Sequence, residues 1–136
     1  TKNKTIESSN KKHSILKLLV VEDDLINVQY LKEILSRYKT CEFEFAYDGI
    51  EAIEKCRNNN YHIMLLDIQL PGMNGFEVAR KIREFNKKIT IIAQTAFAMA
   101  EDKTKCIAAG CNNYISKPIN YLELFSMLDS YNTGSQ

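Results

Sequence analysis

The chain has 136 residues, of which 45% are hydrophobic, and it carries 18 basic and 17 acidic residues for a net charge of +1. That length fits one domain with a full hydrophobic core and is too short for two. The balanced charge gives no indication of a nucleic-acid or membrane-surface partner. No apolar run approaches the roughly 20 residues that cross a bilayer, and no signal-peptide pattern opens the chain.

The cysteines and the two ends of the chain bound the domain. The cysteines show no CxxC spacing and are Cys41, Cys56, Cys106 and Cys111. We expect buried, reduced thiols of a cytosolic protein rather than disulfides or a zinc site. Residues 1–14 are polar and rich in lysine, which predicts a linker or tail. We therefore expect the domain to occupy residues 15–131, with residues 132–136 as a second tail.

Apolar runs and helical spacing alternate along the chain. Short apolar runs predict strands at residues 15–21, 41–46, 63–66, 89–93 and 113–116. Each run is followed by a helical pattern, and Gly110 and Asn120 are expected to stop the fourth helix and cap the fifth. The third helix is expected to bury Phe76, Ala79, Ile82 and Phe85. The fifth is expected to bury Tyr121 or Leu122, Phe125 and Leu128. Strict alternation predicts a parallel sheet with helices on both faces.

Polar side chains stand where these strands end. Glu22 and Asp23 follow the first strand, Asp67 the third, Thr95 ends the fourth and Lys117 follows the fifth. The carboxyl ends of parallel strands meet at one edge of a sheet, so these side chains should lie together. Three carboxylates repel one another unless a cation lies among them, and Mg²⁺ takes such oxygen ligands. The hydroxyl and the ammonium suit the oxygens of a phosphoryl group.

Each of these residues also has a simpler interpretation. Glu22, Asp23 and Asp24 could cap the first helix. Thr95 could be a strand residue with high β-propensity, and Lys117 a solvated residue in a turn before proline. The joint arrangement, with a polar residue at the end of several apolar strands, favours a functional site.

Five motifs in order resemble the receiver domain of two-component response regulators over about Ile15 to Ser130. They are Leu-Val-Val-Glu-Asp-Asp with Asn27 four residues after Asp23, Ala-Tyr-Asp-Gly-Ile-Glu-Ala, Leu-Leu-Asp-Ile-Gln-Leu-Pro-Gly-Met-Asn-Gly, Gln-Thr-Ala, and Tyr-Ile-Ser-Lys-Pro-Ile-Asn. The resemblance implies a flavodoxin-like α/β fold, a doubly wound five-stranded parallel sheet in the order 2-1-3-4-5.

The resemblance also implies roles for the residues at the strand ends. Asp67 is the phosphoacceptor, which takes a phosphoryl group from a phosphohistidine. Asp23, Asp67 and the backbone carbonyl of Gln69 hold Mg²⁺, and Glu22 acts directly or through water. Many relatives have Asp-Asp where this chain has Glu-Asp, which changes the geometry at Glu22. Lys117 pairs with the phosphoryl oxygens.

A second set of implied roles concerns the response to phosphorylation. Thr95 moves to bond the phosphoryl group and Tyr114 turns inward behind it, so both are switch residues. Gln69 and Phe97 lie at positions that resemble tuning sites for the lifetime of the acyl phosphate. Pro118 is expected to follow a cis peptide bond, which suits a tight turn that aims the preceding lysine.

The polar lead-in, the initial threonine, and the Gln-Thr-Ala-Phe-Ala-Met and Lys-Pro-Ile-Asn segments resemble receivers at the carboxyl end of hybrid sensor histidine kinases. That implies a kinase core upstream and a histidine phosphotransfer partner, which exposed Leu25 and Ile26 would dock. The domain is then a cytoplasmic phosphoacceptor that assists its own phosphorylation, without nucleic-acid or membrane contacts of its own. Its parent would be a histidine protein kinase, of a type compatible with anchoring in an inner membrane.

Other functions remain as alternatives. A free-standing single-domain regulator and a receiver-like module that only mediates contacts share the same motifs. A flavodoxin-type nucleotide binder needs a phosphate-cradling loop where this chain has Glu22, Asp23 and Asp24. A phosphatase that uses an aspartyl phosphate usually has a second acid two residues after the nucleophile, where this chain has Gln69.

Overall fold

The structure is a computed structural model that describes residues 15–38, 41–96 and 100–132. Five parallel strands form one sheet in the order β3-β2-β4-β5-β6. They are β2 (Leu16–Val21), β3 (Cys41–Ala46), β4 (Ile63–Asp67), β5 (Thr90–Thr95) and β6 (Asn113–Ser116). Numbered along the chain, this is the predicted order 2-1-3-4-5, so the flavodoxin-like α/β fold is confirmed.

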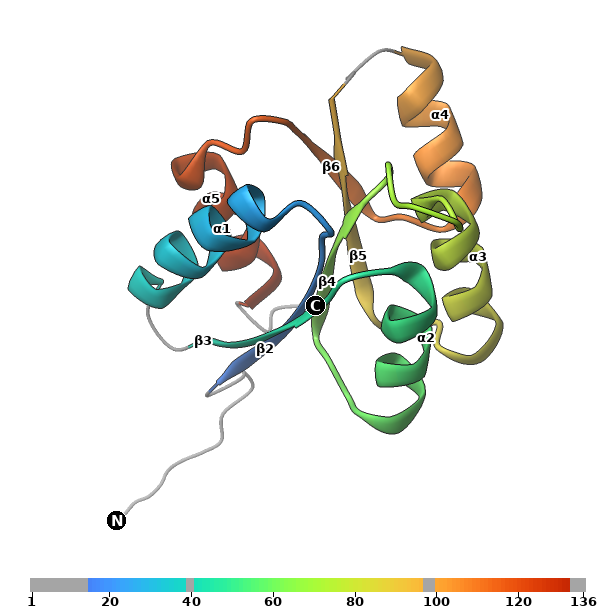
Figure 1. Ribbon diagram of the computed structural model, residues 1–136, viewed down its shortest axis with the longest axis horizontal. Coiled ribbons are helices and arrows are strands. Elements are labelled where there is room, and N and C mark those ends of the chain that lie inside the picture. The colour runs from blue at the N-terminus through green and yellow to red at the C-terminus, as the bar shows by residue number, and fades with distance from the viewer. Residues whose placement is uncertain (1–14, 39–40, 97–99, 133–136) are drawn as a thin grey trace.

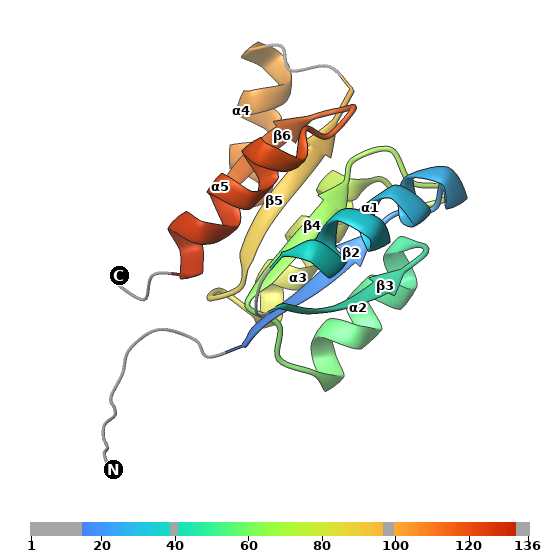
Figure 2. The ribbon, with the colours of Figure 1, turned by 90° about the vertical axis from the view of Figure 1, so that its left-hand side faces the viewer.

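Five helices connect the strands and cover both faces of the sheet (Figure 1). They are α1 (Leu25–Arg37), α2 (Gly49–Asn58), α3 (Gly75–Phe85), α4 (Ala100–Ala109) and α5 (Tyr121–Asn132). One layer consists of α1 and α5, which lie side by side in front of the sheet in Figure 2. The other layer consists of α2, α3 and α4. Each layer encloses its own hydrophobic core against the sheet.

The burial of the strands follows their place in the sheet. All five residues of β4, the central strand, are buried, as a strand covered by helices on both faces requires. In β3, at the edge, Glu42 and Glu44 are exposed and Phe45 is buried. This alternation of charged and aromatic residues is typical of a strand at the edge of a sheet.

The predicted apolar face of α3 is partly wrong. Val78, Ala79 and Ile82 are buried against the sheet. Phe85 is exposed instead, and its ring lies 4.5 Å from the guanidinium of Arg57. Phe85 is the last residue of the helix, where the chain turns away, so helical spacing alone overestimated its burial.

The predicted apolar face of α5 is also wrong at its start. Tyr121 and Leu122 are exposed, whereas Leu124 and Leu128, one helical turn apart, are fully buried. The first five residues of α5 do not show from the sequence which face of the helix is buried. Leu124 and Leu128 pack in the core that α5 shares with α1, and this packing sets the buried face. The predicted cap is confirmed: Asn120 Oδ1 accepts a hydrogen bond from the Glu123 N–H at 3.0 Å.

Several local predictions are confirmed. The Lys117–Pro118 peptide bond is cis, and Gly110 ends α4 with a φ of 104°. All four cysteines are free and three of them are buried.

Within the described ranges no helix is long and apolar enough to cross a membrane. The predicted second tail, residues 132–136, begins one residue too early, because Asn132 is the last residue of α5. The predicted tail at residues 1–14, residues 133–136 and Phe97 lie outside the described residues.

Candidate functional site

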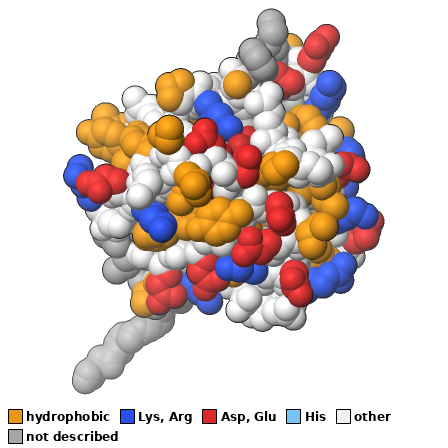
Figure 3. Space-filling view, in the orientation of Figure 1, with side chains coloured by type: hydrophobic (Ala, Val, Ile, Leu, Met, Phe, Trp, Pro, Cys, Tyr) orange, Lys and Arg blue, Asp and Glu red, His pale blue; other side chains and the backbone are white. Residues whose placement is uncertain are grey.

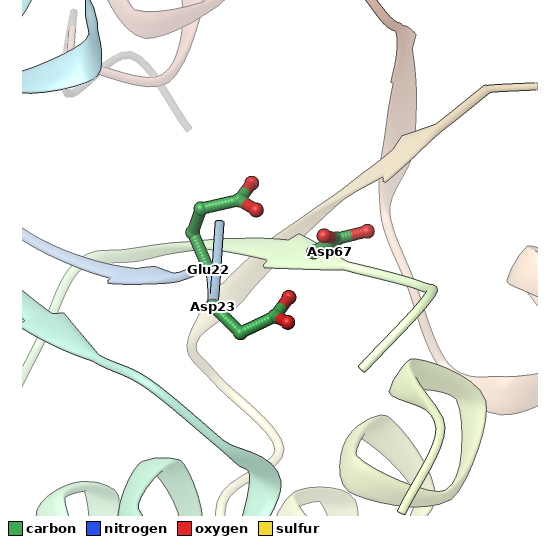
Figure 4. A group of neighbouring side chains, drawn as sticks. All are labelled: Glu22, Asp23 and Asp67. Carbon is green, nitrogen blue, oxygen red and sulfur yellow. The ribbon is translucent and has the colours of Figure 1, made fainter. Parts of the chain in front are cut away.

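Two neighbouring strands deliver three carboxylates to one edge of the sheet. Glu22 and Asp23 directly follow β2, and Asp67 is the last residue of β4, which pairs with β2. One carboxylate oxygen from each residue lies within 4.8 Å of the others, and the three side chains converge beyond the strand ends (Figure 4). The predicted acidic cluster is therefore present.

The third acid of the run, Asp24, has a different task. It is the N-cap of α1, and its Oδ1 accepts a hydrogen bond from the Ile26 N–H at 2.9 Å. Its own N–H donates to Glu22 Oε2 at 3.1 Å. The capping interpretation thus holds for Asp24, while Glu22 and Asp23 face the site.

The ionised form of Glu22 is unfavourable in the folded domain. The residue is fully buried, and its Oε1 has no hydrogen-bond partner among the described residues. Burial, followed by repulsion from Asp67, raises the pKa of Glu22 from 4.5 to about 7. A cation beside Oε1 would supply the missing partner and favour the ionised form. Three acidic oxygens around such a point match the ligands that Mg²⁺ prefers, so the residues present fit this ion.

Asp67 is held from two sides. It is only 1% exposed; Lys117 Nζ lies 2.8 Å from its Oδ2, and the Gln69 N–H donates to its Oδ1 at 2.9 Å. The Lys117 N–H donates to the Thr95 carbonyl at 2.8 Å, which ties the lysine to the end of β5. The ends of β4 and β6 therefore meet at one carboxylate, and the end of β5 holds the backbone of the lysine.

Thr95 and Tyr114 lie on adjacent strands, as predicted, and on the same face. Thr95 pairs with Ser116 and Tyr114 with Ala93, two residues earlier in the register. Paired residues, and residues two apart on one strand, project to the same side of a parallel sheet. Tyr114 is partly buried and packs against the core beneath α2, α3 and α4, and Lys103 Nζ lies 5.9 Å from its ring centroid.

The turn after β4 is built around two glycines. Gly72, which follows Pro71, has a φ of 79°, a conformation that glycine adopts readily. A Cβ on Gly75 would lie 2.5 Å from the backbone oxygen of Asp67, so only glycine fits there. Asn74 and Glu77 form a capping box that starts α3 beside this contact. The loop that follows Asp67 is therefore fixed at both ends.

Sequence reasoning missed the surroundings of Lys117. A groove of about 580 Å³ lies between α1 and the loop that joins β6 to α5. Gln94 lines it and is buried, with no hydrogen-bond partner for its Nε2 among the described residues. Tyr30 reaches across from α1, and its hydroxyl donates to the Ile119 carbonyl at 2.9 Å. No local pattern signals a contact between residues so far apart in the chain.

The family model of the response regulator receiver domain matches residues 18–129. This chain is a response regulator receiver domain. Its function is that of a receiver in two-component phosphorelay signal transduction. Among curated proteins, the receiver domain is 41% identical over 123 residues to hybrid signal transduction histidine kinase L of Dictyostelium discoideum, covering 85% of this chain and 7% of the kinase. The chain spans between 4% and 26% of the length of the first three curated relatives.

Two solved receiver structures are similar over most of the domain. One is the Ssk1 receiver domain of Saccharomyces cerevisiae, co-crystallised with the histidine phosphotransfer protein Ypd1: it has a TM-score of 0.82 and 31% identity, covering 87% of this chain and 89% of that one. The other is the receiver of sensor histidine kinase PA1611 from Pseudomonas aeruginosa, which has magnesium in its active-site cleft. Its TM-score is 0.79 at 30% identity, covering 87% of this chain and 98% of that one.

Proposed function

We propose that Asp67 is the phosphoacceptor of this receiver domain and that the donor is a phosphohistidine. The observation that carries the proposal is the position of Asp67, a buried carboxylate in contact with Lys117 and within 4.8 Å of two further acids. In the reaction, an oxygen of Asp67 attacks phosphorus, the P–N bond breaks, and its electron pair returns to the imidazole. The products are an acyl phosphate and a free histidine.

Different residues around Asp67 would bind the metal ion and the transferred phosphoryl group. Glu22, Asp23 and Asp67, with the backbone carbonyl of Gln69, would hold Mg²⁺, which when bound offsets the charge of carboxylates and phosphoryl oxygens. Lys117 already contacts Asp67 and would pair with a phosphoryl oxygen after transfer. The supporting observation for the ion is the unpartnered Oε1 of buried Glu22.

The same proposal assigns a switch to Thr95 and Tyr114. Phosphorylation adds negative charge beside Thr95, whose hydroxyl would move toward the phosphoryl group. Tyr114 lies on the same face of the sheet and would fill the space that opens. We expect Tyr114→Ala to abolish the effect of phosphorylation on partner affinity, with Tyr121→Ala, an exposed tyrosine, as control. If Tyr114→Ala responds like the parent domain, the coupling is wrong.

The exposed start of α1 would suit a histidine phosphotransfer domain or a histidine kinase as partner. Leu25 is 70% exposed and Ile26 79% exposed, and both follow the capping Asp24 beside the acidic cluster. Two apolar side chains at this position could pack on a helix bundle that presents its histidine to Asp67. Charges of both signs are interspersed with hydrophobic side chains on the face in Figure 3.

The likeness to hybrid kinases supports a further proposal about the parent protein. We place residues 15–131 as a cytoplasmic receiver behind a linker, carried by a hybrid histidine kinase. A parent gene that encodes the receiver alone would contradict this and favour a free-standing regulator. A module that only mediates contacts would instead fail to accept phosphate.

Intact mass spectrometry tests the phosphoacceptor directly. The domain is incubated with acetyl phosphate, with Mg²⁺ or with a chelator, beside Asp67→Asn as the matched variant. We expect one phosphoryl adduct that requires both the ion and Asp67. An adduct that persists in Asp67→Asn would refute the assignment, and no adduct under any condition would favour the contact-only module.

A further inference from the structure

Lys117 depends on a loop for its position. The residue follows β6, and the chain then runs through Pro118 and Ile119 to the Asn120 cap of α5. Its ammonium must stay over Asp67, at the observed 2.8 Å, to meet a phosphoryl group. On the β5 side, the bond from the Lys117 N–H to the Thr95 carbonyl holds the loop. The question is what holds it on the side of α1.

Packing supports only part of the loop on that side: Ile119 is buried in the core that α1 and α5 share, whereas Pro118 is exposed. The groove of about 580 Å³ separates the loop from the first turns of α1, with Ile26, Tyr30 and Leu31 on one wall and Lys117 and Pro118 on the other. Contacts across such a space lose the dispersion energy of close-packed atoms. Tyr30 crosses it, and its hydroxyl donates to the Ile119 carbonyl at 2.9 Å, a bond between residues 89 positions apart.

We propose that Tyr30 is a positioning residue for phosphoryl transfer. Its hydroxyl holds the Ile119 carbonyl, and the short segment back through Pro118 keeps the Lys117 ammonium against Asp67. The inference rests on the proposed phosphoacceptor role of Asp67. Loss of the hydroxyl removes the hydrogen bond that α1 makes to this loop, so Lys117 spends less time in the position that stabilises charge on the transferred group.

The chain contains a matched control. Tyr38, the C-cap residue of α1, donates its hydroxyl hydrogen bond to Asp129 Oδ1 on α5 at 2.5 Å. Tyr30 and Tyr38 thus both tie α1 to the α5 region, but Tyr38 lies at the C-terminal end of α1, whereas the acidic cluster adjoins its N-terminal end. Tyr30→Phe and Tyr38→Phe remove the same atom. A general loss of rigidity would affect both variants, whereas positioning of Lys117 is specific to Tyr30.

The test measures phosphorylation of the full chain by acetyl phosphate, as a time course of intact mass at saturating donor and Mg²⁺. We expect Tyr30→Phe to be about fivefold slower, which corresponds to about 1 kcal/mol, and Tyr38→Phe to match the parent. Tyr30 is 39% exposed, so water replaces part of the lost bond and the effect stays moderate. Mg²⁺ affinity by calorimetry should be the same in all three proteins, because the groove lies outside the carboxylate cluster.

A double-mutant cycle with Lys117→Ala decides whether the effect passes through the lysine. We expect Tyr30→Phe to cause no further slowing in the Lys117→Ala background. The same fivefold loss in that background, or an unchanged rate in Tyr30→Phe alone, overturns the inference while leaving Asp67 as the phosphoacceptor. If the parent domain forms no adduct at Asp67, the proposed function fails and the inference fails with it.

Discussion

Replacing Glu22 with glutamine is expected to stabilise the metal-free domain, although it removes a residue of the site. Glu22 is fully buried, and one of its two carboxylate oxygens has no partner among the described residues. Glutamine keeps the shape of the side chain and can keep the oxygen that accepts the Asp24 N–H. It removes only the charge that burial and Asp67 oppose.

The size of the effect follows from the pKa of Glu22. The unfolded chain loses this proton near the ordinary pKa of 4.5 and the folded domain only near 7, so ionisation favours unfolding. The penalty is absent below pH 4.5, grows as the pH rises to 7, and is constant above. The gap between 4.5 and about 7 is worth about 3 kcal/mol at pH 8 and about 1 kcal/mol at pH 5.5.

Urea unfolding followed by circular dichroism measures this difference, with a chelator present, at pH 8 and at pH 5.5. Glu22→Gln is expected to exceed the parent by about 3 kcal/mol at the higher pH and by about 1 kcal/mol at the lower. Glu54→Gln, a change at an exposed glutamate of α2, should have little effect at either pH. Added Mg²⁺ should stabilise the parent more than Glu22→Gln and narrow the gap. If Glu22→Gln is no more stable than the parent at pH 8, or if the difference in the free energy of unfolding is the same at pH 8 and pH 5.5, the reasoning is refuted.

Four further substitutions test the frame of the domain, each by urea unfolding. Gly75→Ala should lower the free energy of unfolding by about 2 kcal/mol and slow phosphorylation, because the new Cβ would lie 2.5 Å from the Asp67 backbone oxygen. Gly72→Ala is its control: the new Cβ meets open space but the residue has a φ of 79°, so the loss should be about 1 kcal/mol and phosphorylation should be unchanged. Arg83→Met removes two hydrogen bonds from the end of α3 to the loop after α4 and one to Asn86, the C-cap of α3, and should cost about 2 kcal/mol. A loss below about 0.5 kcal/mol would contradict the role of these bonds. Asn74→Ala breaks the capping box and should cost about 1 kcal/mol, and no loss would show that Glu77 alone starts the helix.

The sequence was most informative where a local pattern carries the whole physical cause. In a chain whose strands and helices alternate, an apolar run that ends on a polar residue places that residue at the carboxyl edge of a parallel sheet. Asp67, Thr95 and Lys117 were found in this way, and Glu22 and Asp23 with them. The helix stop at Gly110 and the cap at Asn120 were likewise local, because each is decided within four residues.

Features set by contacts between distant elements could not be read from the chain. The buried face of α5 depends on how the helix packs in the core that it shares with α1. Tyr121 or Leu122 was expected to be buried, and both are exposed. The sequence could not show which of the three successive acids caps the first helix. The hydrogen bond from the Ile26 N–H identifies Asp24 as the cap of α1. The bond from Tyr30 to Ile119 spans 89 positions and leaves no trace in either local sequence.

The most direct test of the central claim is to locate the phosphoryl group chemically. Borohydride reduces an acyl phosphate to the alcohol, so a phosphorylated aspartate becomes homoserine, which peptide mass spectrometry can place. After incubation with acetyl phosphate and Mg²⁺, we predict homoserine at position 67 alone, and none when the ion is chelated. Homoserine at Asp23, or none at all in a domain that carries the adduct, would contradict Asp67 as the phosphoacceptor.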